Sequence, residues 1–173
     1  GEIMDFESRA WWMVDVDEVQ QLAESGDFSE LKSASPEELP GCNEAIVKVI
    51  EYAHTEFGID CSKIVVGGFS QGAMLMTDVA LTFEQSLGGL IVWSGTLICE
   101  GKWQALAGQH QFPICQSHGT LDPILPFDLA VDLCNLFADA DLAVEFTEFE
   151  GPHEVSVSAM KSAMKLIRKS LKL

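Results

Sequence analysis

Short apolar segments alternate with longer segments of helical periodicity along most of this 173-residue chain. Apolar runs predict strands at residues 63–67, 90–93, 112–117 and 144–149, and apolar spacings of three and four predict helices at 42–57, 71–83, 127–138 and 155–171. Strands that alternate with helices of this length indicate βαβ units on a parallel sheet. The chain is therefore expected to be an α/β protein.

Residues 1–41 show much weaker periodicity. They are rich in acidic residues, contain the turn-like sequence Ser-Ala-Ser-Pro at 33–36, and predict a loop-rich segment with one short helix. No shift in composition marks a domain boundary, so residues 1–173 are expected to form a single domain, with 1–41 as its loop-rich N-terminal segment.

The segment Gly68-Phe69-Ser70-Gln71-Gly72 has the pattern G-x-S-x-G and lies between a predicted strand and a predicted helix. A serine at the tip of such a tight turn has strained dihedrals, and glycines on both sides remove side chains that would collide. The helix N-terminus presents free N–H groups, so the N–H of Gln71 is a candidate oxyanion donor. The alternative is a glycine-rich turn whose serine only caps the helix.

A serine hydroxyl becomes a nucleophile when a base takes its proton and a carboxylate orients that base. Asp122 and His153 follow the third and fourth predicted strands, so the chain order is serine, aspartate, histidine. Open α/β sheets place their sites at the carboxyl ends of strands. We therefore expect Ser70, Asp122 and His153 to form a catalytic triad.

Other histidines and acids fit these roles less well. His118 precedes the expected catalytic aspartate at the end of its own strand and is interpreted as shaping the loop that follows. His54 falls within a predicted helix and His110 in a polar loop. Asp128 is expected to be a first-turn acid of a helix, and Glu154 to face solvent. No group of histidines and acids has the spacing of metal ligands.

Four segments carry a family resemblance: Gly-Gly-Phe-Ser-Gln-Gly-Ala at 67–73, His-Gly-Thr-Leu-Asp-Pro-Ile-Leu-Pro at 118–126, Glu-Gly-Pro-His at 150–153, and Arg-Ala-Trp-Trp at 9–12. They resemble the phospholipase/carboxylesterase family of α/β-hydrolases, which includes the acyl-protein thioesterases. The resemblance implies a three-layer sandwich and hydrolysis of carboxylic esters or thioesters by Ser70, Asp122 and His153. It implies no metal and no organic cofactor. The family usually continues the last of these segments with aspartate, where this chain has Met13.

The family also has several strands and an H-G-x-G-D loop before the tryptophan segment, and residues 1–60 contain nothing similar. We therefore expect a sheet that lacks its N-terminal strands and whose serine-bearing strand lies at an apolar edge, which favours association. The chain would be the C-terminal two-thirds of a hydrolase, and its partner would be the missing N-terminal segment or a second copy. The alternative is a catalytically silent binding or assembly protein on the same fold, without a complete oxyanion hole.

Large apolar residues near the expected site are candidates for an acyl pocket, although most such residues belong to a core. They are Trp11, Trp12, Leu97, Ile124, Leu125 and Phe127.

The net charge of −17 comes from 27 acidic and 10 basic residues. Such a chain repels phosphate backbones and anionic lipid, so nucleic acid is excluded as an expected partner. No apolar run approaches the roughly 18 residues that a membrane span needs. Five cysteines without a paired motif fit a reducing, cytoplasmic compartment better than a disulfide framework.

Overall fold

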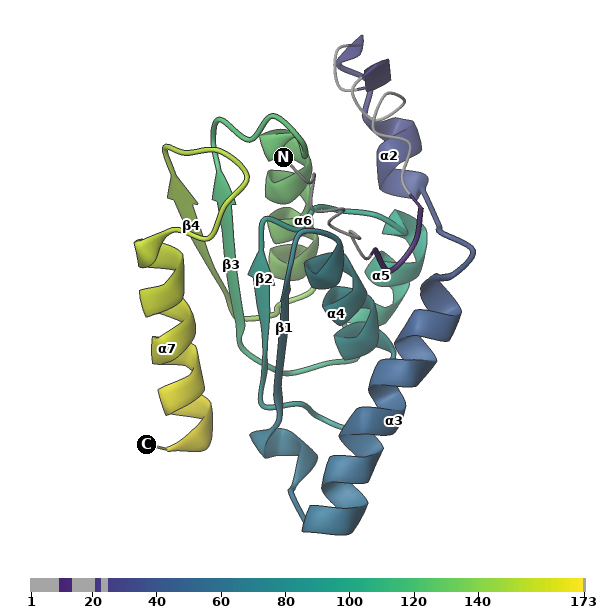
Figure 1. Ribbon diagram of the computed structural model, residues 1–173, viewed down its shortest axis with the longest axis vertical. Helices are drawn as coiled ribbons and strands as arrows, with labels where there is room; N and C mark the ends of the chain where they lie inside the picture. The colour runs from purple at the N-terminus through teal and green to yellow at the C-terminus, as the bar shows by residue number, and fades with distance from the viewer. Residues whose placement is uncertain (1–9, 14–20, 23–24, 173) are drawn as a thin grey trace, which may run out of the picture.

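The computed structural model describes residues 10–13, 21–22 and 25–172. Its strands are β1 (Val65–Phe69), β2 (Gly89–Trp93), β3 (Ile114–Gly119) and β4 (Val144–Phe149). Its helices are α2 (Ser29–Ser33), α3 (Leu39–Phe57), α4 (Gln71–Thr82), α5 (Glu100–Ala107), α6 (Phe127–Asp139) and α7 (Val157–Leu171), with a short 3₁₀ turn η1 (Cys61–Lys63) before β1 (Figure 1). No helix within the described residues is long and apolar enough to cross a membrane.

The four strands form one parallel sheet in the order β1-β2-β3-β4, which confirms the predicted α/β architecture. The register pairs Gly68 with Val92 and Trp93 with Ser117. The carboxyl ends of the parallel strands therefore lie on the same side of the sheet, at the top of Figure 1. Within the described residues, β1 pairs with β2 alone and is an edge strand, as predicted.

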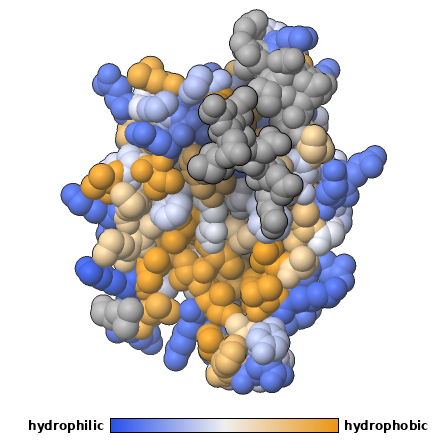
Figure 2. Space-filling view, viewed as in Figure 1, coloured by the Kyte–Doolittle hydropathy of each residue, from blue (hydrophilic) through white to orange (hydrophobic). Residues whose placement is uncertain are grey.

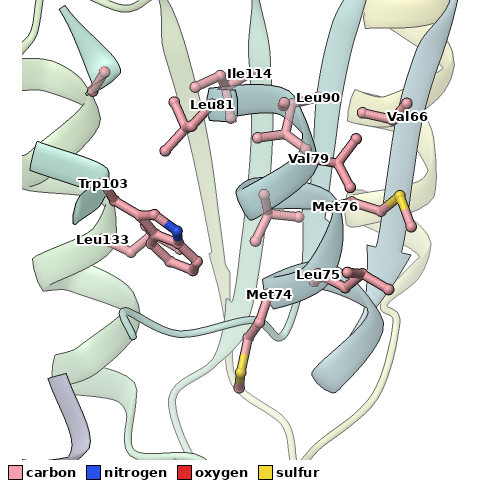
Figure 3. Packing of buried hydrophobic residues seen from close by; sticks show 14 of the residues in the cluster. Val66, Met74, Leu75, Met76, Val79, Leu81, Leu90, Trp103, Ile114 and Leu133 are labelled. Carbon is pink, nitrogen blue, oxygen red and sulfur yellow. The ribbon is translucent and has the colours of Figure 1, made fainter. Parts of the chain in front are cut away.

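Helices cover both faces of the sheet and make three layers. Leu90 and Val92 of β2 face the core on the α4 side, whereas Ile91 packs with Leu166 of α7 on the opposite face. This alternation follows from the two-residue period of a strand that is buried on both faces. Figure 3 shows part of the α4 side, where Trp103 of α5 points toward α4.

Several element boundaries differ from the expectations. Helix α3 begins at Leu39 rather than at residue 42, because Pro40 is compatible with a first helical turn, where an N–H has no helical partner. Strand β3 runs from 114 to 119 rather than from 112 to 117, so that His118 lies in the strand and not after it. Helix α5 was not expected. Its eight residues bury only Trp103 and Ala107, too few for a clear helical period.

The N-terminal segment is described only in part. Helix α2, five residues long, lies in the segment for which one short helix was predicted, but residues 21–22 and 25 are helical as well, and residues 34–38 lead into α3. Arg9, the first residue of the Arg-Ala-Trp-Trp motif, lies outside the described residues.

Candidate active site

Ser70 occupies a tight turn between β1 and α4. Its dihedrals are φ 56° and ψ −125°, which a residue with a side chain rarely adopts. The backbone at Ser70 is therefore strained. The turn is anchored by the Ser70 N–H, which donates to the carbonyl oxygen of Trp93 at 2.8 Å. Strand and helix thus hold the serine at the carboxyl end of the sheet.

The glycines around the serine do not contribute equally. A Cβ at Gly68 would collide with the backbone of Gly72 and would lie 2.7 Å from the nitrogen of Ala73, so only glycine fits there. A Cβ at Gly72 would meet only the indole nitrogen of Trp11, at an ordinary 3.6 Å. The expectation that both glycines prevent collisions is therefore correct for Gly68 and wrong for Gly72. The reason is that a Cβ at Gly68 would point into the backbone of the first turn of α4, whereas a Cβ at Gly72 would meet no atom of the strand within 4 Å.

Gln71 opens helix α4, and its backbone N–H belongs to the first turn, where helical N–H groups have no intrahelical acceptor. Its side chain has a contact that the sequence did not indicate. Oε1 accepts the N–H of Trp11 at 2.7 Å, and Nε2 donates to the carbonyl oxygen of Trp12 at 2.8 Å. The side chain of Gln71 thus fastens the tryptophan segment beside Ser70.

Asp122 follows β3 and is fully buried at its carboxylate. One oxygen, Oδ2, lies 2.6 Å from Nδ1 of His153, and the other, Oδ1, accepts the N–H groups of Ile124 and Leu125 at 2.8 and 2.9 Å. Burial alone would raise the pKa of Asp122, but the nearby imidazole of His118 and hydrogen bonds from His153 and these two amides together hold the pKa well below its ordinary value. The carboxylate is therefore ionised at neutral pH.

His153 follows β4 and points Nδ1 at Asp122, which leaves Nε2 for a second partner. Its ring packs against the ring of Phe69, the residue before Ser70, with a centroid separation of 4.7 Å. The hydrogen bonds of the described residues do not include one between Ser70 Oγ and His153. The structure thus joins Asp122 to His153 directly and places the imidazole against the residue next to Ser70.

The loops that carry Asp122 and His153 are held together by backbone contacts. The N–H of Thr120 donates to the carbonyl oxygen of Phe149, and the N–H of Leu121 donates to that of Gly151. Gly119 permits this approach, because a Cβ there would lie 2.5 Å from the carbonyl oxygen of Pro152 and closer still to that of Gly151. The relative position of the aspartate and the histidine is therefore set by the backbone.

A cavity of about 650 Å³ opens beside Ser70 and Gln71. Four of the six residues predicted for an acyl pocket line it: Trp12, Leu97, Ile124 and Leu125. The side chains that the sequence did not single out include Met74, Thr96, Ile98, Pro126 and Leu129. Local patterns could not identify them, because the cavity wall is assembled from α4, α6 and the segment after β2.

The other two pocket candidates lie elsewhere. Trp11 does not line the cavity and is 43% exposed, with its indole nitrogen near Gly72. Phe127 also lies outside the cavity lining, and its ring stacks on Phe146 at 6.0 Å. Exposed carboxylates of Glu30, Glu37 and Glu38 lie at the cavity on the side of the N-terminal segment.

Of the other histidines and acids considered for the predicted catalytic roles, four lie outside the cavity lining. His54 and His110 each contact a backbone carbonyl oxygen away from the cavity, and Asp128 and Glu154 are exposed. His118 differs from the expectation, because it reaches Asp122 itself as well as the loop. No group of three histidines, cysteines or acids within the described residues could hold a metal ion. All five cysteines are free, as expected.

A model of the phospholipase/carboxylesterase family matches residues 24–171. Among curated proteins, acyl-protein thioesterase 1 of Candida albicans is 27% identical over 132 residues, which cover 72% of this chain and 57% of that protein. Acyl-protein thioesterase 1 of Debaryomyces hansenii is 31% identical over 133 residues, which cover 75% of this chain and 57% of that protein. The chain thus spans little more than half the length of these relatives.

Two solved structures share the fold. SOBER1 of Arabidopsis thaliana is 24% identical with a TM-score of 0.69, over 78% of this chain and 65% of that one. Esterase PE8 is 21% identical with a TM-score of 0.72, over 93% of this chain and 70% of that one. These likenesses identify the three-layer arrangement as an α/β-hydrolase fold.

Proposed function

Because this chain belongs to the phospholipase/carboxylesterase family, we propose that it forms the reacting part of a serine hydrolase that cleaves carboxylic esters or thioesters. The main support is the largely buried hydrogen bond of 2.6 Å between Asp122 and His153, whose ring packs beside the strained turn of Ser70. A carboxylate, an imidazole and a hydroxyl at the ends of three strands of one sheet are the groups that acyl transfer requires.

In this proposal, Ser70 Oγ attacks the acyl carbon while Nε2 of His153 accepts the hydroxyl proton. Asp122 orients the imidazole and stabilises its cationic form. The N–H of Gln71 donates to the oxyanion of the tetrahedral intermediate. His153 then gives its proton to the departing alcohol or thiol, water attacks the acyl-enzyme with His153 as base, and the carboxylic acid leaves with Ser70 restored.

The cavity beside Ser70 is the proposed acyl site. Trp12, Leu97, Ile124 and Leu125 give it a largely apolar lining, and an apolar lining favours an acyl chain over a charged group. Unpaired cysteines fit a reducing, cytoplasmic setting for this chemistry.

A fluorophosphonate probe tests the nucleophile. The folded protein is expected to be labelled on Ser70, and the Ser70→Ala variant is expected to lose the label. Ser158→Ala, which changes an exposed serine on α7, is the matched control and should keep it. A folded protein that binds a ligand or partner but takes no label would refute hydrolysis and favour the silent binding or assembly protein.

We also propose that the free edge of β1 is covered in the active protein, by further strands of the hydrolase or by a second copy of this chain. Figure 2 shows an apolar surface between α7 and α3, around this edge. Both helices carry exposed apolar side chains, such as Val49 of α3 and Met160 and Met164 of α7. A neighbour there would pair the open backbone groups and supply a second oxyanion donor. An active, monodisperse monomer of 18.9 kDa would refute this proposal.

A further inference from the structure

A second imidazole contacts the carboxylate of Asp122. His118 is completely buried in β3, and its Nε2 lies 3.2 Å from Oδ2 of Asp122 and 3.1 Å from the carbonyl oxygen of Leu125. The other ring nitrogen, Nδ1, is also buried and has no hydrogen-bond partner among the described residues. Oδ2 thus contacts both imidazoles, that of His118 in strand β3 and that of His153 in the loop after β4.

The partners of the His118 ring determine where its proton lies. Both neighbours of Nε2 are acceptors, a carboxylate and a carbonyl, so the proton is on Nε2. A proton on Nδ1 would be a buried donor without an acceptor, which is costly. The ring can therefore donate from Nε2 to the Leu125 carbonyl while the same nitrogen lies within reach of the Asp122 carboxylate.

We propose that His118 is a positioning residue of the active site, which holds the Asp122 carboxylate against His153 and withdraws part of its charge. This role rests on the proposed function. The Nε2 of His118, 3.2 Å from Oδ2, acts on Asp122 in the same direction as the hydrogen bond from His153, and both lower the pKa of Asp122. The bond to the Leu125 carbonyl also ties β3 to the turn that follows it, at the wall of the cavity.

Other ionisable groups around His118 are farther into solvent. Glu148 of β4 is its register partner in the sheet, and Asp128 is in the first turn of α6, which packs on the same face of the sheet. Both are exposed. An apolar side chain of α6 also meets the imidazole, since the ring of Phe127 contacts His118 edge-on with ring centroids 6.1 Å apart. Asp122 is thus the charged group that the imidazole of His118 contacts.

Paired variants test the role in the active protein. His118→Leu removes the donor, and His118→Gln restores an N–H close to the position of Nε2. Loss of the bond to Leu125 and of the polar contact with the charged Asp122 should lower kcat/KM about tenfold in His118→Leu. More of the Asp122 charge then stabilises protonated His153, so the acid limb of the pH profile should move to higher pH. His118→Gln should return both toward wild type.

A purely structural His118 would lower the stability of the variants and leave the acid limb in place, which would overturn the proposal. Imidazole ¹⁵N NMR on the wild-type protein gives a second readout that needs no turnover and no variant. It should show His118 protonated on Nε2 alone, and a proton on Nδ1 would also overturn the proposal. If NMR shows His118 protonated on Nε2 while the fluorophosphonate labels nothing, the proposed function fails, but the contact of His118 with Asp122 stands.

Discussion

Gly119 is the position where a single methyl group should separate Asp122 from His153. In Gly119→Ala the new Cβ would lie 2.5 Å from the carbonyl oxygen of Pro152, whereas ordinary contacts begin at 3.4 Å. The obstructing atoms are backbone, so they cannot swing aside as a flexible side chain would. The loop of residues 150–153 must retreat by about 0.9 Å or more, and His153 moves with it.

The size of the effect follows from this displacement. Forcing atoms into a packed region costs about 1–3 kcal/mol of unfolding free energy. A misplacement of about 1 Å at a reacting group can lower the rate about 10²-fold. We therefore expect Gly119→Ala to lose 1–3 kcal/mol of stability and about 10²-fold in kcat, through a longer bond between His153 Nδ1 and Asp122.

Urea unfolding and fluorophosphonate labelling rates measure the two effects, and the Nδ1 proton resonance of His153 reports the bond directly. Gly101→Ala is the matched control, because a Cβ there meets nothing within 4 Å and its helical position tolerates alanine. The control should be as stable as wild type or slightly more so, with an unchanged labelling rate.

The reasoning is refuted if Gly119→Ala unfolds within 0.5 kcal/mol of wild type and labels at the same rate, a difference of the size that ordinary surface substitutions give. That result would mean that the two loops yield without moving the imidazole, and that the backbone does not set the geometry of the pair.

Asp78→Ala should lower the free energy of unfolding by about 1–3 kcal/mol in urea denaturation, because it leaves the buried Nε1–H of Trp103, now 2.8 Å from Asp78 Oδ1, without an acceptor. Gln71→Glu should cost about 1 kcal/mol and speed hydrogen exchange in the tryptophan segment, because a carboxylate cannot donate to the Trp12 carbonyl; unchanged exchange would contradict the clamp. Asp122 has a lowered pKa, so its contribution to stability is present above pH 3.8 and is lost as the pH falls through the folded value. Asp122→Asn should therefore be less stable at pH 7, and its stability should change less than that of wild type on acidification below about pH 4. An equally steep acid transition in the variant would show that other groups control it.

The local patterns of the sequence predicted the elements that have a strong period. The apolar runs that predicted strands at 63–67 and 90–93 lie in or overlap β1 and β2, although β1 begins and ends two residues later than predicted. The helices at 71–82 and 127–139 repeat apolar residues every three or four positions. Helix α5 could not be found in this way, because only Trp103 and Ala107 of its residues are buried. The last residues of β3 were also missed, since His118 and Gly119 are buried by tertiary contacts and not by an apolar pattern.

By itself, the sequence determined the α/β alternation, the turn that presents Ser70, and the order in which Ser70, Asp122 and His153 follow their strands. These features depend on neighbouring residues, whose periodicity and steric limits are readable along the chain. Only the tertiary structure decided that two imidazoles share one carboxylate oxygen, that Gln71 fastens the tryptophan segment, and which side chains line the cavity. The bonds of Asp122 to His153 and of Gln71 to the tryptophan segment join residues 31 and 60 positions apart, and the distances in all these contacts are fixed by how the strands, helices and loops pack against one another.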